Sequence, residues 1–188
     1  MSDNSSIKAV SSKDIFKMIF ESEKIFRAHD GKCIEVKEHS ENVCKICKDI
    51  ALQLKTGGIE VDKKLLKKVA YLHDIGKANY DGDAHPYMSL VYMYNIFDCS
   101  GGKKEEYAWK LGQIIIAHKG IFCPPVCIAK EAAILRMADK IDRFGRKDDA
   151  SKKYKRNLKK IESYFECYDA AFFENLKKAC DTAKEQYS

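Results

Sequence analysis

Apolar residues recur every three or four positions along most of the chain, and few segments alternate between apolar and polar residues. This spacing is typical of helices that bury one face, whereas strict alternation is typical of strands. The clearest stripe lies within residues 36–55 and is formed by His39, Val43, Ile46, Ile50 and Leu54. The pattern therefore predicts an all-α protein.

The predicted helices cover most of the sequence. We expect them over residues 14–28, 36–55, 62–75, 86–97, 103–118 and 127–143, with two further helices between 149 and 186. Ser12 and Asp62 are candidate N-caps, and Pro86 suits a first helical turn. Gly76 is expected to close the third helix and to let the chain turn sharply after it. The two C-terminal helices are expected to meet near Cys167–Asp169.

No linker divides the chain. We expect the polar residues 1–11 to be poorly ordered and residues 12–188 to form one domain. Within that domain, residues 36–146 carry the candidate chemistry described below. Residues 149–186 add helices after it.

The composition allows a substantial core. Of the 188 residues, 45% are hydrophobic and 33% are charged, which excludes a disordered tail and a membrane-embedded protein. The longest uncharged apolar stretch, residues 86–97, is too short to cross a bilayer. The polar N-terminus lacks the apolar core of a signal peptide. We therefore expect a soluble, cytoplasmic protein with no membrane partner.

The net charge and the cysteine content give only weak evidence about ligands and metal sites. The net charge is +6, and much of the excess lies between Arg143 and Lys160. A lysine-rich cluster of this kind is typical of a solvated helix, although a moderate positive field also suits phosphate-bearing ligands. We expect the eight cysteines to be free, buried thiols, because no export signal is evident. The pair Cys44 and Cys47 falls on a predicted helix, which favours small core residues over zinc ligands.

Histidines and aspartates at inward helical positions are the candidate chemistry. His39 lies on the stripe described above, and His73 and His118 fall at the ends of similar stripes. Asp139 ends a stripe as well, and a buried carboxylate without a partner is very costly. A shared cation resolves this cost, since it binds neutral imidazole nitrogens and neutralises carboxylates. The segment HDIGK at residues 73–77 therefore indicates a metal site rather than an ordinary helix end. By contrast, we expect His29 to lie in a loop.

The order of these residues resembles a known family. The segments are EHSEN with His39, YLHDIGK with His73 and Asp74, DAHPYMS with His85, IIAHKG with His118, and RMADKID with Asp139. The set is similar to that of the HD superfamily of metal-dependent phosphohydrolases, an all-α family, and to its members with two metals. The resemblance implies one ion held by His39, His73, Asp74 and Asp139. It implies a second ion held by His85, His118 and the shared Asp74.

The resemblance also implies a reaction. Mixed imidazole and carboxylate ligands suit divalent transition metals, with Fe or Mn expected first and Zn, Co or Ni as alternatives. Two such ions activate water for attack on phosphorus. Asp74 is the candidate for orienting that water, and Lys77 for stabilising charge on the phosphate oxygens. Further candidate phosphate contacts are Lys119, Arg143 and Arg146, each of which a surface position explains equally well.

Three functions are compatible with the sequence. The first is hydrolysis of a small nucleotide-like substrate, including dinucleoside polyphosphates, because the small domain and the ADKID segment resemble the bacterial hydrolases that split diadenosine tetraphosphate symmetrically. The second is a cyclic dinucleotide phosphodiesterase. The third is a non-catalytic regulatory or nucleic-acid-binding module with the same fold. We expect a small phosphorylated substrate rather than nucleic acid, because the most basic part of the tail lacks interleaved aromatic residues.

Overall fold

All regular elements in the described part of the chain are helices. The computed structural model describes residues 32–78, 83–96, 102–144 and 149–187. The elements are α3 (Lys32–Thr56), α4 (Lys63–Leu72), η1 (Ile75–Ala78), α5 (His85–Ile96), α6 (Gly102–Ala117), η2 (Val126–Ile128), α7 (Ala129–Ile141), α8 (Ala150–Phe165) and α9 (Ala170–Tyr187). The all-α prediction is confirmed. The expectations for residues 1–11, for a helix over 14–28 and for His29 lie outside the described residues.

The predicted helix ends are close to the observed ones, with one informative difference. Asp62 is the N-cap of α4 and accepts hydrogen bonds from the backbone N–H groups of Lys64 and Leu65 at 3.0 and 2.9 Å. The predicted helix over residues 62–75, however, ends at Leu72. The chain then passes through a turn into the short 3-10 helix η1. The His73–Asp74 pair therefore lies in the turn between two helices and not inside one.

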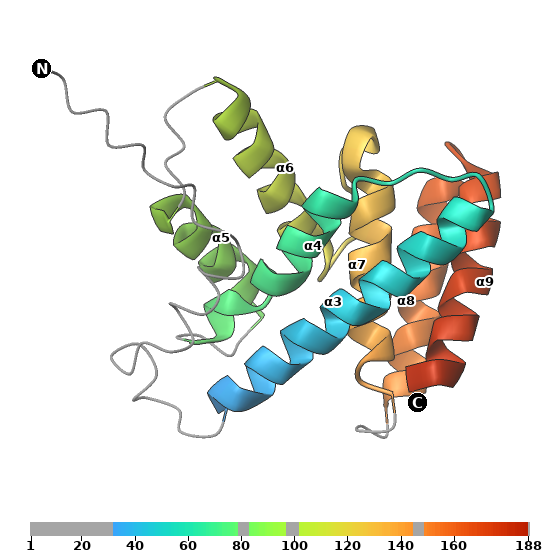
Figure 1. The fold of residues 1–188 in the computed structure, drawn as a ribbon, viewed down its shortest axis with the longest axis horizontal. Coiled ribbons are helices and arrows are strands. Elements are labelled where there is room, and N and C mark those ends of the chain that lie inside the picture. The colour runs from blue at the N-terminus through green and yellow to red at the C-terminus, as the bar shows by residue number, and fades with distance from the viewer. Residues whose placement is uncertain (1–31, 79–82, 97–101, 145–148, 188) are drawn as a thin grey trace, which may run out of the picture.

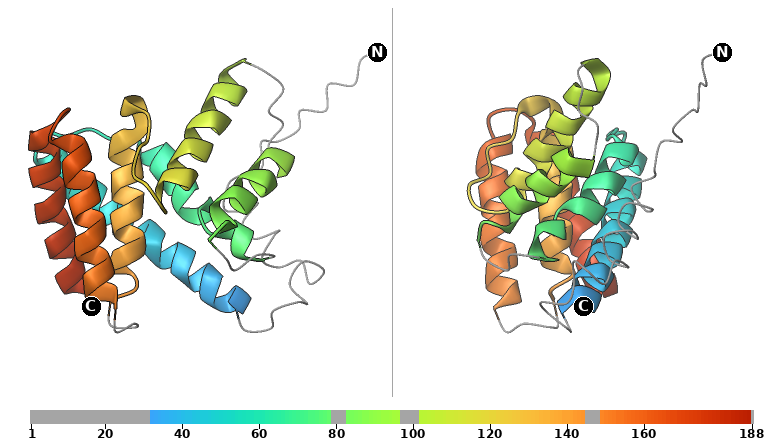
Figure 2. Two further views of the ribbon diagram at one scale, coloured as in Figure 1. Left: turned by 180° about the vertical axis from the view of Figure 1, so that it is seen from behind. Right: turned by 90° about the vertical axis from the view of Figure 1, so that its left-hand side faces the viewer.

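Helix α7 is the centre of the fold. It contacts α3, α4, α6, α8 and α9, and only Lys130 and Lys140 of its thirteen residues are not buried. A helix buried on all sides must lie in the interior of a protein. Figure 1 shows α3 running across the molecule beside α7, with α8 and α9 at one end and α5 and α6 at the other. The reverse view in Figure 2 shows the same order. The C-terminal pair therefore packs directly on the helix that carries Asp139.

Helix η1 packs very closely on α5 through Gly76. A Cβ atom added to Gly76 would lie 2.3 Å from the backbone oxygen of His85 and 2.5 Å from the backbone nitrogen of Ser89. The Gly76 N–H donates to Ser89 Oγ at 2.9 Å, and this hydroxyl lies 2.9 Å from the backbone oxygen of His73. Gly76 does not have a positive φ. The chain does turn between α4 and α5, but it does so without a left-handed glycine, and the structure shows that Gly76 allows this close contact.

In the described ranges, no helix combines the length and apolar character that crossing a bilayer requires.

We predict that Gly76→Ala destabilises the fold by about 1–3 kcal/mol, because the added methyl group meets backbone atoms of α5 that cannot move alone. Urea unfolding followed by circular dichroism measures this free energy. The matched control is Gly112→Ala in α6, where the nearest atom is the end of the flexible Leu90 side chain at 2.8 Å. Equal stability of the two variants would contradict the close-contact explanation.

Candidate metal centre

Two groups of buried histidine and aspartate side chains meet where five elements of the fold converge. The first group consists of His39, His73, Asp74 and Asp139, and the second of Asp74, His85 and His118. Within each group, one nitrogen or oxygen atom of every residue lies within 4.8 Å of the others. All six side chains are buried. The structure thus brings together all six residues that the sequence singled out as metal ligands.

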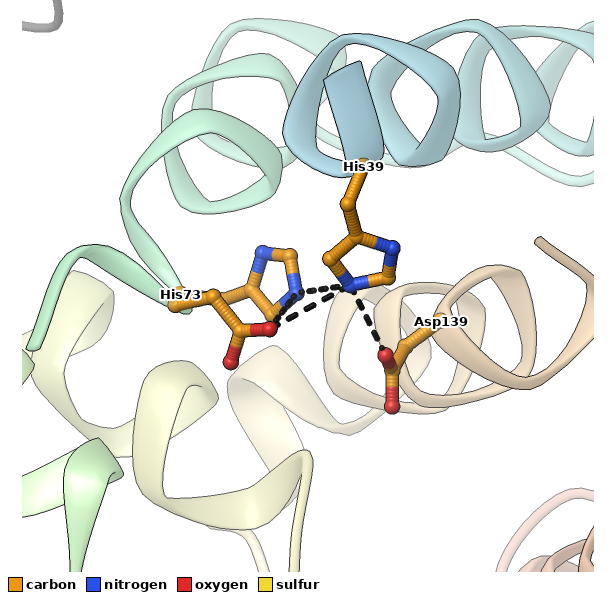
Figure 3. A group of neighbouring side chains, drawn as sticks. His39, His73 and Asp139 are labelled. Carbon is orange, nitrogen blue, oxygen red and sulfur yellow. Dashed lines mark hydrogen bonds and ion pairs between the residues drawn. The ribbon is translucent and has the colours of Figure 1, made fainter. Parts of the chain in front are cut away.

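The first group lies between α3, the α4–η1 turn and α7. His39 Nε2 is 3.1 Å from Asp139 Oδ1 and 3.2 Å from Asp74 Oδ2. His73 Nε2 is 3.5 Å from the same oxygen of Asp74. Figure 3 shows His39, His73 and Asp139 pointing toward one another from three separate elements. These atoms surround a point that a single ion could occupy.

The second group uses the other carboxylate oxygen of Asp74. His85 Nε2 lies 2.9 Å from Asp74 Oδ1, and His118 Nε2 lies 3.6 Å from it. His85 is the first residue of α5, and His118 follows the last residue of α6. Asp74 therefore faces the first group with one oxygen and the second group with the other, which is the geometry of a bridging ligand.

The tautomers of the histidines indicate a cation in the first group. His73 Nδ1 lies 2.9 Å from the backbone oxygen of Ala70, and His39 Nδ1 lies 2.5 Å from Asp142 Oδ2. Each Nδ1 must donate to its oxygen, so the neutral ring carries a lone pair on Nε2. Yet the Nε2 atoms of His39 and His73 are only 3.3 Å apart. Two lone pairs face each other favourably only when positive charge, from a proton or a metal ion, lies between them.

The second group has a similar arrangement. His118 Nδ1 is hydrogen bonded to the backbone oxygen of Ile115, which leaves a lone pair on Nε2. This atom lies 3.3 Å from His85 Nε2. In addition, Oδ1 of Asp74 and Oδ1 of Asp139 are buried and accept no hydrogen bond of good geometry from the described residues. The donor set, nitrogen and carboxylate oxygen, suits divalent transition metals. Both groups therefore fit a metal ion.

The carboxylates of the centre are ionised. Burial by itself would raise the pKa of Asp74, but His73, His118, His39 and His85 hold this pKa well below its ordinary value. Burial likewise opposes the ionisation of Asp139, and Lys140, Arg143 and His39 outweigh it and lower the pKa. Two anionic carboxylates without access to water require positive charge nearby.

The histidines differ in their affinity for protons. Burial lowers the pKa of His73 to about 3, so this imidazole is neutral near neutral pH. Burial also lowers the pKa of His118. For His39 burial acts in the same direction, but hydrogen bonds and charge from Asp139 and Asp74 outweigh it and raise the pKa. A proton and a metal ion therefore compete for His39 Nε2.

Three cationic side chains lie against the two carboxylates. Lys77 Nζ contacts Asp74 Oδ2, and Lys140 Nζ contacts Asp139 Oδ2. Arg143 Nη2 lies 3.0 Å from Asp139 Oδ1 and 3.7 Å from Asp74 Oδ2. Lys77 and Arg143 were singled out from the sequence, and both lie at the centre. The positive charge on this side is suited to an anionic substrate.

The two remaining predicted substrate contacts are Lys119 and Arg146. Lys119 forms an ion pair with Asp83 at 2.8 Å, and neither residue belongs to the two groups. Arg146 lies outside the described residues.

Cysteine contributes nothing to either group, as far as the described residues show. The six cysteines whose side chains the structure describes are free thiols. Cys47 and Cys180 are buried and Cys44 is half-buried, whereas the exposed ones are Cys123, Cys127 and Cys167. The expectation of core thiols therefore holds for only part of the set.

Sequence reasoning missed three residues around the centre. Asp142 orients His39, Lys140 contacts Asp139, and Ser89 connects the His73 carbonyl to α5. Lys140 and Asp142 lie in the same RMADKID segment as Asp139, and a position three residues further along a helix lies on the same side of it. That spacing was the available signal for Asp142. Ser89 gave no comparable signal, because its role depends on how closely η1 approaches α5.

Comparison with known proteins identifies a family domain over the region that contains the two groups. The family model described as HD domain matches residues 36–143, more than half of the chain. All six residues of the two groups fall within this span. No curated protein and no solved structure matches the chain.

We predict that the metal content depends on which ligand is removed. Asp74→Ala should lose both ions because Asp74 faces both groups. Asp139→Ala and His85→Ala should each lose one ion, from the first and second group respectively. Elemental analysis of protein purified without chelator measures the stoichiometry, with Asp49→Ala, outside both groups, as the control. Full retention of either ion by Asp74→Ala would refute the shared geometry.

We predict that Asp142→Asn weakens metal binding in the first group by about 10- to 100-fold, because the carboxylate that fixes the His39 ring is lost. Competition with a chromogenic chelator measures the affinity of each ion separately. The affinity of the second group serves as the internal control. An unchanged first affinity would show that the contact between Asp142 and His39 does not tune the ligand.

Proposed function

The chain belongs to the HD domain family, whose members are generally metal-dependent hydrolases, and on this premise we propose that it is a phosphohydrolase with two metal ions. The observation that carries the proposal is the position of Asp74, whose two oxygens face two separate sets of imidazoles. A single ion would use only one of these oxygens. Two neighbouring ions use both, because each ion takes one oxygen of the shared carboxylate.

The ligands would divide as the two groups do. His39, His73 and Asp139 would hold one ion, His85 and His118 the other, and Asp74 both. When bound, such ions supply an activated water and polarise phosphoryl oxygens. The protein contributes a set of rings held in one tautomer by the hydrogen bonds to Ala70, Asp142 and Ile115. These ligands are thus oriented before any ion arrives.

The cationic side chains would bind and orient the substrate. Lys77 and Arg143 each contact a carboxylate of the centre, and both side chains are partly exposed to solvent. Once metal ions neutralise the carboxylates, these two cationic groups would be available to bind phosphate oxygens of the substrate. Positive groups placed where charge develops stabilise the transition state of phosphoryl transfer. Lys140, in contact with Asp139 and less exposed, would support the same field.

We propose that the substrate is nucleotide-like, with dinucleoside polyphosphates as the first compounds to test. The support is the cationic side of the centre together with the resemblance of the ADKID segment. Cyclic dinucleotides and non-catalytic binding are the competing functions. A panel of nucleotides, dinucleoside polyphosphates and cyclic dinucleotides, assayed with Mn, Fe and Co, distinguishes them. Salt-sensitive binding of nucleic acid without hydrolysis would favour the non-catalytic module.

We predict that Lys77→Ala lowers kcat/KM toward the best substrate of this panel by about 10²- to 10³-fold, because a charge that stabilises the developing anion is removed. Metal content should stay at the wild-type level. The control is Lys110→Ala, a lysine that pairs with Glu106 on the outer face of α6. Removal of both ions by a chelator should abolish turnover, and re-addition of metal should restore it. Turnover by metal-free protein would defeat the proposal.

A further inference from the structure

The end of α6 is held by a buried arginine from another helix. The last carbonyls of any α-helix lack partners within the helix. Here Arg136 of α7, only 1% exposed, donates through Nη1 to the Ala117 oxygen at 2.8 Å and through Nη2 to the Gly120 oxygen at 2.7 Å. These two carbonyls lie on either side of His118. The guanidinium therefore fixes the backbone that presents this histidine to Asp74.

The turn that carries His118 needs such support. Gly120 has a φ of +71°, in the left-handed region, where the chain leaves the helix direction. Ala117 is the last residue of α6, so its carbonyl lies beyond the hydrogen-bond ladder of that helix. The Lys119 N–H reaches the Ile116 oxygen only at 3.4 Å. Arg136 thus supplies strong contacts that hold this turn on the rest of the protein.

Helix α8 holds Arg136 in this position. Asn157 Oδ1 accepts from Arg136 Nε at 2.6 Å, and the Asn157 amide donates to the Lys153 oxygen of its own helix at 2.7 Å. The second contact fixes the amide so that its oxygen faces the guanidinium. One turn further along α8, Lys160 Nζ also donates to the Gly120 oxygen, at 2.9 Å. Phe122 lies beneath the guanidinium, with its ring centroid 5.6 Å from Arg136 Cζ.

The set of acceptors is unusual for a buried cation. Burial lowers the pKa of Arg136 to about 10, so the group remains charged near neutral pH. The guanidinium donates to two carbonyl oxygens and one amide oxygen, whereas buried arginines commonly pair with carboxylates. A fork with several fixed donors can hold two carbonyls and an amide at once, which lysine cannot do. The position therefore selects for the geometry of arginine and not only for its charge.

We propose that Arg136, held by Asn157, is a positioning residue for the second group of the metal centre, and that α8 acts on the centre through it. The inference rests on the proposed two-metal function. Its direct consequence is selectivity: disturbing Arg136 or Asn157 should displace His118 and weaken the second ion, while the first group keeps its ligands. A general loss of packing would instead weaken both ions.

The test measures the two metal affinities by titration with Mn(II), using electron paramagnetic resonance to separate paired from single ions. The wild-type protein is expected to bind two ions. In Arg136→Lys and Asn157→Ala the first ion should bind with wild-type affinity and the second about tenfold more weakly, with loss of the paired signal. Asn157→Asp retains an oxygen acceptor for Arg136 and should recover most of the second affinity.

The matched control is Glu131→Gln, also on α7. Glu131 is buried and accepts from the Asp62 N–H at 2.7 Å, so it too joins α7 to the end of another helix, but in the first turn of α7 and away from His118. This variant should lower the thermal midpoint and keep both affinities. Circular dichroism verifies that every variant is folded.

The outcomes separate the two proposals. A wild-type protein that binds fewer than two ions overturns the two-metal centre on which the inference rests. A wild-type protein that binds two ions, together with Arg136→Lys and Asn157→Ala variants that keep both affinities, overturns only the role of Arg136. That role is also overturned if the variants weaken both ions in equal proportion.

Discussion

The removal of two carboxylates from water is the constraint on which the rest of the structure depends. Asp74 is fully buried and Asp139 almost so, and each is held in its ionised form by the groups around it. An isolated buried carboxylate would take up a proton instead. The surrounding imidazoles stabilise the carboxylates only in part, because hydrogen bonds on the far sides of His73 and His118 leave lone pairs that point at the centre. Lys77, Lys140 and Arg143 supply positive charge from one side, and a bound cation would supply it among the imidazoles.

The fold meets this constraint by placing the ligands mainly at helix ends. His73 and Asp74 follow α4, His85 begins α5, His118 follows α6, and Asp139 lies in the last turn of α7. A side chain at a helix end is positioned by the whole helix, yet the local backbone can still turn to aim it. His39 is the exception, since it lies within α3 and is aimed by Asp142 instead. Close contacts such as that of Gly76 with α5 then fix the distance between neighbouring helix ends.

The sequence predicts features that depend on neighbouring residues better than features that depend on contacts between distant segments. Helices and their buried stripes follow from local periodicity, so α3 and the break between α8 and α9 were predicted well. The six residues of the centre could be selected because inward histidines and aspartates are rare and their order resembles a family pattern. What local patterns do not encode is how closely two elements approach. The early end of α4, the reason for Gly76 and the roles of Ser89 and Arg136 all depend on such approaches.

Helix α7 shows why these long-range contacts are hard to see in the sequence. Arg136 and Asp139 lie three residues apart on one side of α7, and Arg143 follows Asp139 by four residues, just after the helix ends, so the three charges form a stripe along a helix that is mostly buried. Burying such a stripe without partners would destabilise the fold, because each charge loses its hydration. In the folded protein each member has its own partners. Arg136 binds the backbone around His118, Asp139 faces His39, and Arg143 neutralises Asp139. Arg136 binds the turn after α6 and Asn157 of α8, and Asp139 faces His39 of α3, so the stripe has all of these partners only when α3, α6 and α8 are in place. The residues that support the metal centre are therefore also residues of the core, and α8 contributes to both through Asn157.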